Sequence, residues 1–257
     1  MKNYKKMFLI CVFSMILVLL GACSDTKSRN VEELTSKNIQ DPSVPENSIF
    51  RPHIELLNNN LDAGTAFGVE LEGRKEPYVI TAIHLFGPNG GLDKDIPSVE
   101  LAKNIKKVSI TDVFSSKECG TLDKILTIPE AKPVPEIDKD IAVFIGTSDL
   151  KINKFKINAG LPKEGDNVWL AASVYGGAPE NQKLHKATIT SVGEKGLYFK
   201  YENSNLKLQA TSGAPILNSD GQVIGINISM ISKNGDLIGV ANPSCSFIKL
   251  IKNALNR

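Results

Sequence analysis

The sequence predicts a mostly β protein with one helix at its carboxyl end. Its apolar runs are short, rich in Val and Ile, and separated by Gly, Asn, Asp or Pro, which is the pattern of strands joined by turns. After Ser246 the pattern changes, because apolar side chains recur at the i, i+3, i+4 spacing of a helix with one buried face. The stretch from Ile49 to Arg257 is long enough for one globular unit or two small packed halves.

Ten apolar runs are predicted to form strands. In the first half of the chain they cover residues 63–71, 78–85, 107–113 and 141–146. In the second half they cover residues 167–173, 188–192, 197–201, 215–217, 223–229 and 237–241. Asn218-Ser219-Asp220-Gly221 has the composition of a tight turn, so the runs on either side of it are expected to form a hairpin.

The amino terminus has the composition of an export signal. A basic start is followed by an apolar run from Met7 to Ala22, which is shorter than the about 18 residues that usually span a bilayer. Leu20-Gly21-Ala22-Cys23 resembles the bacterial lipobox, in which the cysteine is lipidated and becomes the first mature residue. We therefore expect a signal peptide over 1–22 and an exported lipoprotein held by acyl chains on Cys23, on the periplasmic or the cell-surface face of a membrane.

The segment that follows Cys23 is polar, contains Pro and Asn, and shows no apolar periodicity up to Ser48. It is expected to be a flexible tether over 23–48, with a folded domain over 49–257. Loss of the three lysines of the signal changes the formal net charge from +2 to −1. A nearly neutral protein lacks the clustered basic residues with which nucleic acid is bound, so a nucleic-acid partner is not expected.

Two cysteines, Cys119 and Cys245, remain in the expected domain. A disulfide between them is possible, but two buried free thiols are the alternative, and the sequence does not give the distance between them. No His-Glu-x-x-His or Cys-x-x-Cys motif occurs, so no metal site and no cofactor are expected. His53 and His185 have no motif around them and are expected to face solvent.

Three short stretches carry the chemistry, in the order His, Asp, Ser. They are Thr81-Ala82-Ile83-His84, Asp140-Ile141-Ala142-Val143 and Thr211-Ser212-Gly213-Ala214-Pro215. A serine hydroxyl needs a histidine to take its proton and a carboxylate to fix that histidine's tautomer, so this set suits nucleophilic catalysis. Alone, each has an ordinary structural explanation: a buried histidine, a strand-end cap and a turn serine.

The flanking residues make the set resemble the trypsin-like serine peptidases. Gly64-Thr65-Ala66-Phe67 with Tyr78 to His84 is similar to their histidine strands, and Asp138 to Val143 is similar to their aspartate segment. Ser212 to Ile216, with Val223 to Asn227 and Leu237 to Pro243, is similar to their serine loop and following strands, most of all in the bacterial HtrA-like branch.

The resemblance covers roughly residues 60–250 and implies an all-β fold of two six-stranded chymotrypsin-type barrels, about 49–152 and 153–257, with the active site between them. Because the sequence stops at Arg257, we expect no PDZ domain. It implies a serine endopeptidase that acts on a polypeptide substrate through an acyl-enzyme. The implied roles are nucleophile for Ser212, base for His84 and orienting carboxylate for Asp140; Asp138, the competing carboxylate, does not abut the apolar strand.

One residue departs from the family pattern. The backbone N–H groups of Ala210 and Ser212 are expected to bind the oxyanion, but most relatives have glycine two residues before the serine. If the loop needs a positive φ at Ala210, its Cβ costs about 1–2 kcal/mol and rotates the N–H away. A catalytically weak or inactive protease-like binding module is therefore the alternative, and a non-enzymatic adhesin or substrate-binding lipoprotein is a third possibility.

Substrate choice is the least determined property. Counting back from the serine puts Leu206 near the base of the substrate pocket, and the strand after the serine loop puts Asn227, Ile228 and Ser229 near one wall. No acidic residue is among them, so small or medium apolar side chains are expected before the cleaved bond, while Lys207 leaves an acidic preference open.

Overall fold

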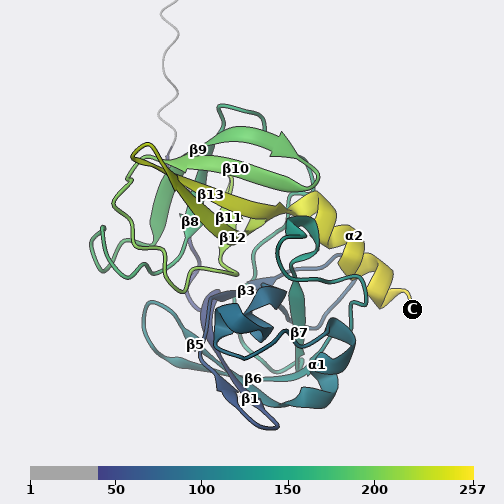
Figure 1. Ribbon diagram of the computed structural model, residues 1–257. Coiled ribbons are helices and arrows are strands. Elements are labelled where there is room, and N and C mark those ends of the chain that lie inside the picture. Colours follow the sequence, from purple (N-terminus) through teal and green to yellow (C-terminus); the bar gives the residue numbers. More distant parts are fainter. Residues whose placement is uncertain (1–39) are drawn as a thin grey trace, which may run out of the picture. The chain divides into compact units, whose positions relative to one another are not determined.

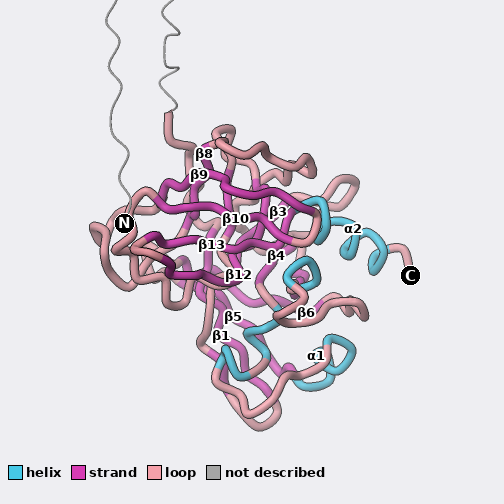
Figure 2. Tube along the Cα trace, turned by 45° about the horizontal axis from the view of Figure 1, so that its top comes forward, coloured by secondary structure: helices cyan, strands magenta, loops and turns pink. Residues whose placement is uncertain are grey.

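The computed structural model describes residues 40–257. The expected signal peptide, Cys23 and most of the expected tether lie outside these residues. Two β-barrels follow each other along the chain (Figure 1), and a second view shows their strands and the carboxyl-terminal helix (Figure 2). The predicted all-β fold of two closed six-stranded barrels with a carboxyl-terminal helix is confirmed. Within residues 40–257 no helix has the length and apolar character needed to cross a membrane.

The first barrel is antiparallel and closes on itself. Its strands follow the order β1-β3-β4-β7-β6-β5, and pairing of β1 with β5 closes the ring while the short β2 extends the sheet beside β1. The strands are β1 (Ile49–Leu56), β2 (Asn60–Leu61), β3 (Ala66–Val69), β4 (Tyr78–Thr81), β5 (Ile105–Asp112), β6 (Glu118–Ile125) and β7 (Ala142–Gly146). The closed ring leaves no long unpaired sheet edge.

The second barrel closes in the order β10-β13-β12-β11-β8-β9. Its strands are β8 (Asn167–Ala171), β9 (Leu184–Gly193), β10 (Gly196–Tyr201), β11 (Pro215–Leu217), β12 (Val223–Lys233) and β13 (Asp236–Pro243). The predicted hairpin turn joins β11 to β12: Asn218 Oδ1 accepts the N–H groups of Asp220 and Gln222 at 3.0 and 2.9 Å, and Gly221 has a φ of 72°. The turn chemistry thus fixes the register of the strand that leaves the serine loop.

Two helices flank the barrels. The predicted one, α2 (Ser244–Leu255), follows Pro243 and buries Phe247 and Ile251, one turn apart, while its other face meets solvent. The short α1 (Ser98–Asn104) was not predicted, because it buries only Ser98 and Leu101. In Figure 1, α2 lies alongside the ribbons of both barrels.

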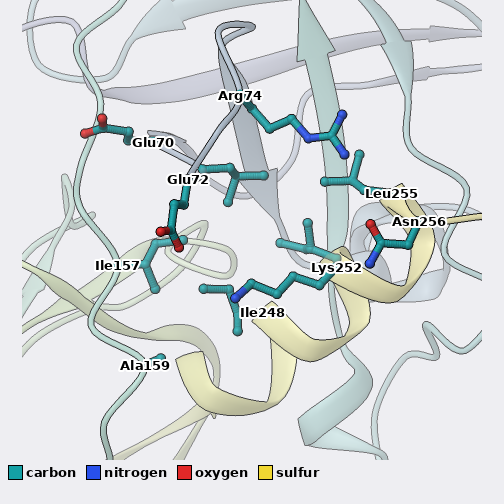
Figure 3. Close-up of a pocket in the computed structure, with 11 residues that line it drawn as sticks. Glu70, Glu72, Arg74, Ile157, Ala159, Ile248, Lys252, Leu255 and Asn256 are labelled. Carbon is teal, nitrogen blue, oxygen red and sulfur yellow. The ribbon is translucent and has the colours of Figure 1, made fainter.

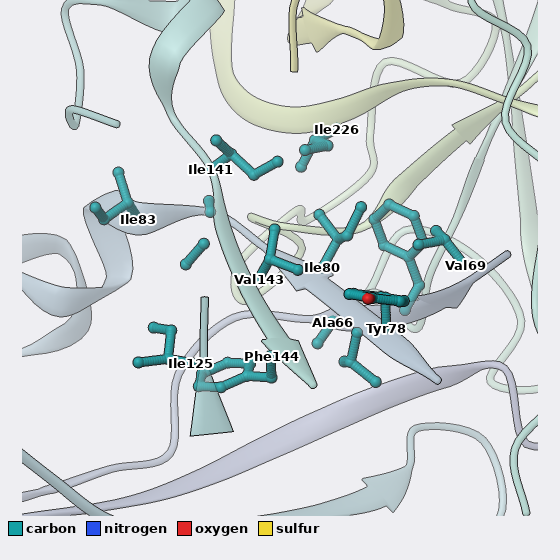
Figure 4. Packing of buried hydrophobic residues seen from close by; sticks show 14 of the residues in the cluster. Ala66, Val69, Tyr78, Ile80, Ile83, Ile125, Ile141, Val143, Phe144 and Ile226 are labelled. Carbon is teal, nitrogen blue, oxygen red and sulfur yellow. The ribbon is translucent and has the colours of Figure 1, made fainter. Parts of the chain in front are cut away.

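Each barrel has an apolar interior. The core of the first barrel is built by strand residues such as Ile80, Val143 and Phe144, and it continues to Ile226 of β12 (Figure 4). Phe247 of α2 belongs to the same core. The smaller core of the second barrel contains Leu170, Ile189, Phe199 and Ile216. Burial of these side chains is the main favourable term, about 25 cal/mol per Å² of apolar surface, and the continuous first core ties the second barrel and α2 to the first.

The amino-terminal end of the described chain lies on the domain rather than in solvent. Trp169 Nε1 donates to Asp41 Oδ1 at 2.9 Å, Gly68 N–H donates to the Ser48 carbonyl at 2.9 Å, and Pro42 and Ser48 are buried. Residues 40–48 were expected to belong to the tether, because polar composition does not distinguish a segment that packs on the domain from one that does not. The folded unit therefore begins before Ile49.

Two further expectations differ from the structure. β1, β2 and β6 were not predicted, because the prediction was based on continuous apolar runs and polar residues interrupt the apolar ones in these strands. Cys119 and Cys245 are both free and partly buried, so neither a disulfide nor a pair of fully buried thiols is present. Burial raises the pKa of the Cys119 thiol.

Candidate active site

His84 lies on a tight turn at the end of β4. The sequence predicted a strand through Leu85, but the strand ends at Thr81 and residues Ile83–Phe86 form a 3₁₀ turn. All four residues of the turn are buried, and His84 is 3% exposed. The turn changes the direction in which side chains project, so the histidine leaves the alternation of β4 and is carried by a rigid, buried segment.

Asp140 holds this histidine at two points. Its Oδ2 accepts from His84 Nδ1 at 2.6 Å, and its Oδ1 accepts the backbone N–H of His84 at 3.0 Å. Asp140 is fully buried two residues before β7, the strand that pairs with β4. A carboxylate at Nδ1 fixes the tautomer in which Nε2 is the proton-accepting nitrogen. The competing Asp138 lies in the preceding 3₁₀ turn and makes no bond to His84.

Asn242 connects the aspartate to the second barrel. Its Nδ2 donates to the Asp140 carbonyl oxygen at 3.2 Å, and its side chain is fully buried at the end of β13. In the sequence, Asn242 was recognised only as part of the family pattern Leu237 to Pro243. Because the donor and acceptor are 102 residues apart, nothing in the local sequence indicates the contact.

Ser212 lies in a compact loop before β11. Thr211 N–H and Oγ1 both donate to the Leu208 carbonyl, at 3.2 and 2.7 Å, and Ala214 N–H donates to the Thr211 carbonyl at 3.0 Å. Asn227 Nδ2 donates to the Thr211 carbonyl and to Thr211 Oγ1, both at 3.1 Å. Buried bonds of this kind hold the loop in one conformation.

Gly213 lets the serine loop pack closely against the first barrel. Thr65 N–H donates to the Ser212 carbonyl at 2.8 Å. Gly213 has a φ of 86°, and a Cβ there would collide with the Thr65 carbonyl and with Thr81 Oγ1. Since Thr81 is three residues before His84, the backbone beside the serine touches the segment that leads into the histidine turn. Only glycine permits this close approach.

The serine hydroxyl makes no hydrogen bond to the imidazole in this conformation. In residues 40–257, Ser212 Oγ has one hydrogen-bond partner, the Ile228 carbonyl at 3.4 Å, and His84 Nε2 has none. The structure therefore brings His84 and Asp140 together directly, and it brings Ser212 to the same barrel interface without a bond to the histidine.

Ala210 has a positive φ of 60°. This left-handed conformation costs a residue with a Cβ about 1–2 kcal/mol relative to glycine. Its N–H and that of Ser212 donate to no acceptor within the part of the chain that the structure describes. These two amides remain available for an external acceptor.

The residues predicted to line the substrate pocket divide into three groups. Ser229 is exposed on β12, and Ile228 is buried but offers its carbonyl beside Ser212. Asn227 is buried and braces Thr211, so its side chain supports the loop. Leu206 is buried in the second core and borders a hollow of about 240 Å³ with Trp169 and His185.

The other two histidines are not simply solvent-facing. His53 is partly exposed and bonds Asp62 Oδ1 at 2.6 Å and Thr111 Oγ1 at 3.0 Å. His185 is 1% exposed, so the prediction was wrong for it; its Nε2 contacts the Ala172 carbonyl at 3.0 Å and burial lowers its pKa. The burial of His185 was not predicted, because no apolar run surrounds Leu184-His185-Lys186. In the structure, position 185 lies on the inward face of β9.

The larger hollows of the described residues lie elsewhere. One of about 430 Å³ runs between α2 and the β3–β4 connection, where Ile157, Ile248 and Leu255 are flanked by Glu72 and Lys252 (Figure 3). It contains none of the three candidate catalytic residues. No cluster of three or more potential metal ligands occurs in residues 40–257.

The chain matches no family model and no curated protein at a significant level. Solved structures do match. A serine endoprotease from Yersinia pestis is 15% identical with a TM-score of 0.55, covering 83% of this chain and 68% of that one. The HtrA-type protease AlgW with a tripeptide is 16% identical with a TM-score of 0.51, covering 81% and 60%.

The active form of the Rv3671c protease from M. tuberculosis is 14% identical with a TM-score of 0.50, and the match covers 80% of each chain. At such low identity the likeness speaks for the fold alone. The paired barrels, their closure and the structural neighbours agree: this chain has the fold of the chymotrypsin-like serine proteases.

Proposed function

We propose that the chain is a serine endopeptidase in which Ser212 is the nucleophile, His84 the general base and Asp140 the orienting carboxylate. The observation that carries the proposal is the fully buried Asp140 carboxylate bonded to both the ring and the backbone of His84, at the barrel interface where the loop of Ser212 is fixed. A buried carboxylate–imidazole pair beside a serine is the arrangement that activates a hydroxyl.

The proposed reaction begins with rotation of the Ser212 side chain from the Ile228 carbonyl toward His84 Nε2. Oγ then attacks the peptide carbonyl carbon while Nε2 takes its proton, and the N–H groups of Ala210 and Ser212 receive the oxyanion. The imidazolium gives its proton to the departing amine, which leaves an acyl-enzyme. Water, deprotonated by His84, hydrolyses the ester and restores the serine.

Reaction with a fluorophosphonate probe tests this directly, since the probe labels activated serine hydroxyls. We expect labelling of the parent, none of Ser212→Ala, and parental labelling of Ser219→Ala, an exposed turn serine. The parent and Ser219→Ala should also hydrolyse a fluorescent casein, and Ser212→Ala should not. Equal labelling of the parent and Ser212→Ala would contradict the assignment.

A protease-like binding module is the second candidate. Two observations favour it: the left-handed Ala210, and the Ser212 hydroxyl turned to the Ile228 carbonyl. In that case folded protein would remain unlabelled by the probe yet would retain unfolded casein, measured by fluorescence anisotropy. Labelling that is lost in Ser212→Ala would exclude the binding module and support the serine endopeptidase.

We also propose that the chain is an exported lipoprotein anchored through Cys23, on the basis of its amino-terminal sequence. Cys23→Ala should abolish incorporation of labelled palmitate and release the protein from the membrane fraction, whereas Cys119→Ala should change neither. Palmitate incorporation that persists in Cys23→Ala would contradict this proposal.

A further inference from the structure

Arg51 of β1 directs its positive charge at two backbone carbonyls. Its Nη1 donates to the Gly64 carbonyl and, at 3.1 Å, to the carbonyl of Ala210. Within residues 40–257 the guanidinium has no carboxylate partner, although it is partly buried and burial lowers its pKa. Arginine stays protonated in proteins, so a full charge acts on the Ala210 carbonyl.

The same carbonyl has a second donor from the first barrel. Thr65 Oγ1 donates to it at 2.8 Å, and Thr65, which is fully buried, also bonds Ser212 through its backbone. The Ala210 carbonyl is therefore held by two side chains that are distant in sequence, separated from it by 159 and 145 positions. Neither side chain belongs to the His, Asp, Ser set.

These bonds act at the one strained residue of the loop. A positive φ disfavours alanine by roughly 5- to 30-fold relative to glycine. The Ala210 carbonyl shares its peptide plane with the Thr211 N–H, and the φ and ψ of Ala210 set the angle between this plane and the preceding one, which carries the Ala210 N–H. A charged donor fixed on a rigid strand opposes relaxation out of that conformation, because relaxation would move the carbonyl away and leave the guanidinium without this acceptor.

We propose that Arg51 is a positioning residue that, with Thr65, holds the Ala210 carbonyl and so keeps the oxyanion-binding amides oriented despite the alanine. This inference rests on the proposed function and adds how its site is preorganised. If the inference holds, Arg51 is needed because residue 210 carries a Cβ. With glycine at position 210, the reactivity of Ser212 should therefore depend much less on Arg51.

The test is a double-mutant cycle read by the second-order rate of fluorophosphonate labelling. We expect Arg51→Met to slow labelling about 5- to 30-fold, the bias that the Cβ imposes. In an Ala210→Gly background the same substitution should cost less than about threefold. Arg74→Met, which removes another arginine far from the serine loop, is the matched control and should label at the parental rate.

A second readout does not need catalysis. Hydrogen exchange of the amides from Leu208 to Ala214 should quicken at least about fivefold in Arg51→Met and stay parental in Arg74→Met. If Arg51→Met fails to fold, Thr65→Val serves in its place, because it removes only the Oγ1 donor to Ala210 and keeps the side-chain shape.

Parental labelling and exchange in Arg51→Met would overturn the inference, while loss of labelling in Ser212→Ala would leave the proposed function standing. An equal slowing of labelling in the parental and Ala210→Gly backgrounds would also overturn it, because Arg51 would then act on something other than the strained residue. A folded parent that never labels contradicts the proposed function instead, and the exchange measurement then decides the inference on its own.

Discussion

Asn242, near the end of β13, donates from Nδ2 to the carbonyl oxygen of Asp140 at 3.2 Å, and both residues are fully buried. One barrel thus supports the backbone of the acidic residue while the other supplies its carboxylate to His84. The relative position of the histidine and the acid is therefore set by bonds from both sides of the interface. Rigid support of this kind is what a catalytic pair needs.

Replacement of the acid should abolish most of the activity. In Asp140→Asn the amide group cannot accept from both His84 Nδ1 and the His84 backbone N–H, so the imidazole loses its orientation and tautomer. We expect the rate of casein hydrolysis to fall about 10³- to 10⁴-fold. Asp138→Asn, two residues earlier in the 3₁₀ turn, is the matched control and should keep parental rates; a loss there of similar size would move the role to Asp138.

Ala210→Gly should stabilise the fold. Removal of the Cβ from the left-handed conformation raises the free energy of unfolding by about 1–2 kcal/mol. The greater freedom of glycine in the unfolded chain lowers it by about 0.4–1 kcal/mol. We expect a net gain of about 0.5–1 kcal/mol in the free energy of urea unfolding. Ala214→Gly, at a buried position of the same loop without a positive φ, should destabilise instead; a destabilised Ala210→Gly would mean that the loop does not strain residue 210.

His185 should make the protein less stable in acid. Burial lowers its folded-state pKa, so the unfolded chain binds a proton that the folded chain does not, and stability is lost as pH falls below the unfolded value of about 6.5. The slope is at most about 1.4 kcal/mol per pH unit. His185→Gln, which stays neutral, should flatten the pH dependence of the urea-unfolding free energy between pH 7 and pH 5. An unchanged dependence in this variant would contradict the prediction.

The sequence by itself determined the strand-rich class, the turn at Asn218 to Gly221, the carboxyl-terminal helix and the residues that could form a catalytic set. These properties are local, because turn residues, apolar periodicity and short motifs act over a few neighbouring positions. The sequence also indicated that Ala210 would be strained if the loop required a positive φ, which is the conformation observed.

Only the tertiary structure decided what lies between the barrels. The contacts of Arg51 and Thr65 with the Ala210 carbonyl, and of Asn242 with Asp140, join residues more than a hundred positions apart. Burial of His185 on the inward face of β9 and packing of Asp41 against Trp169 likewise depend on how the closed sheets meet the rest of the chain. Such contacts follow from barrel closure and core packing, which no short window of sequence contains.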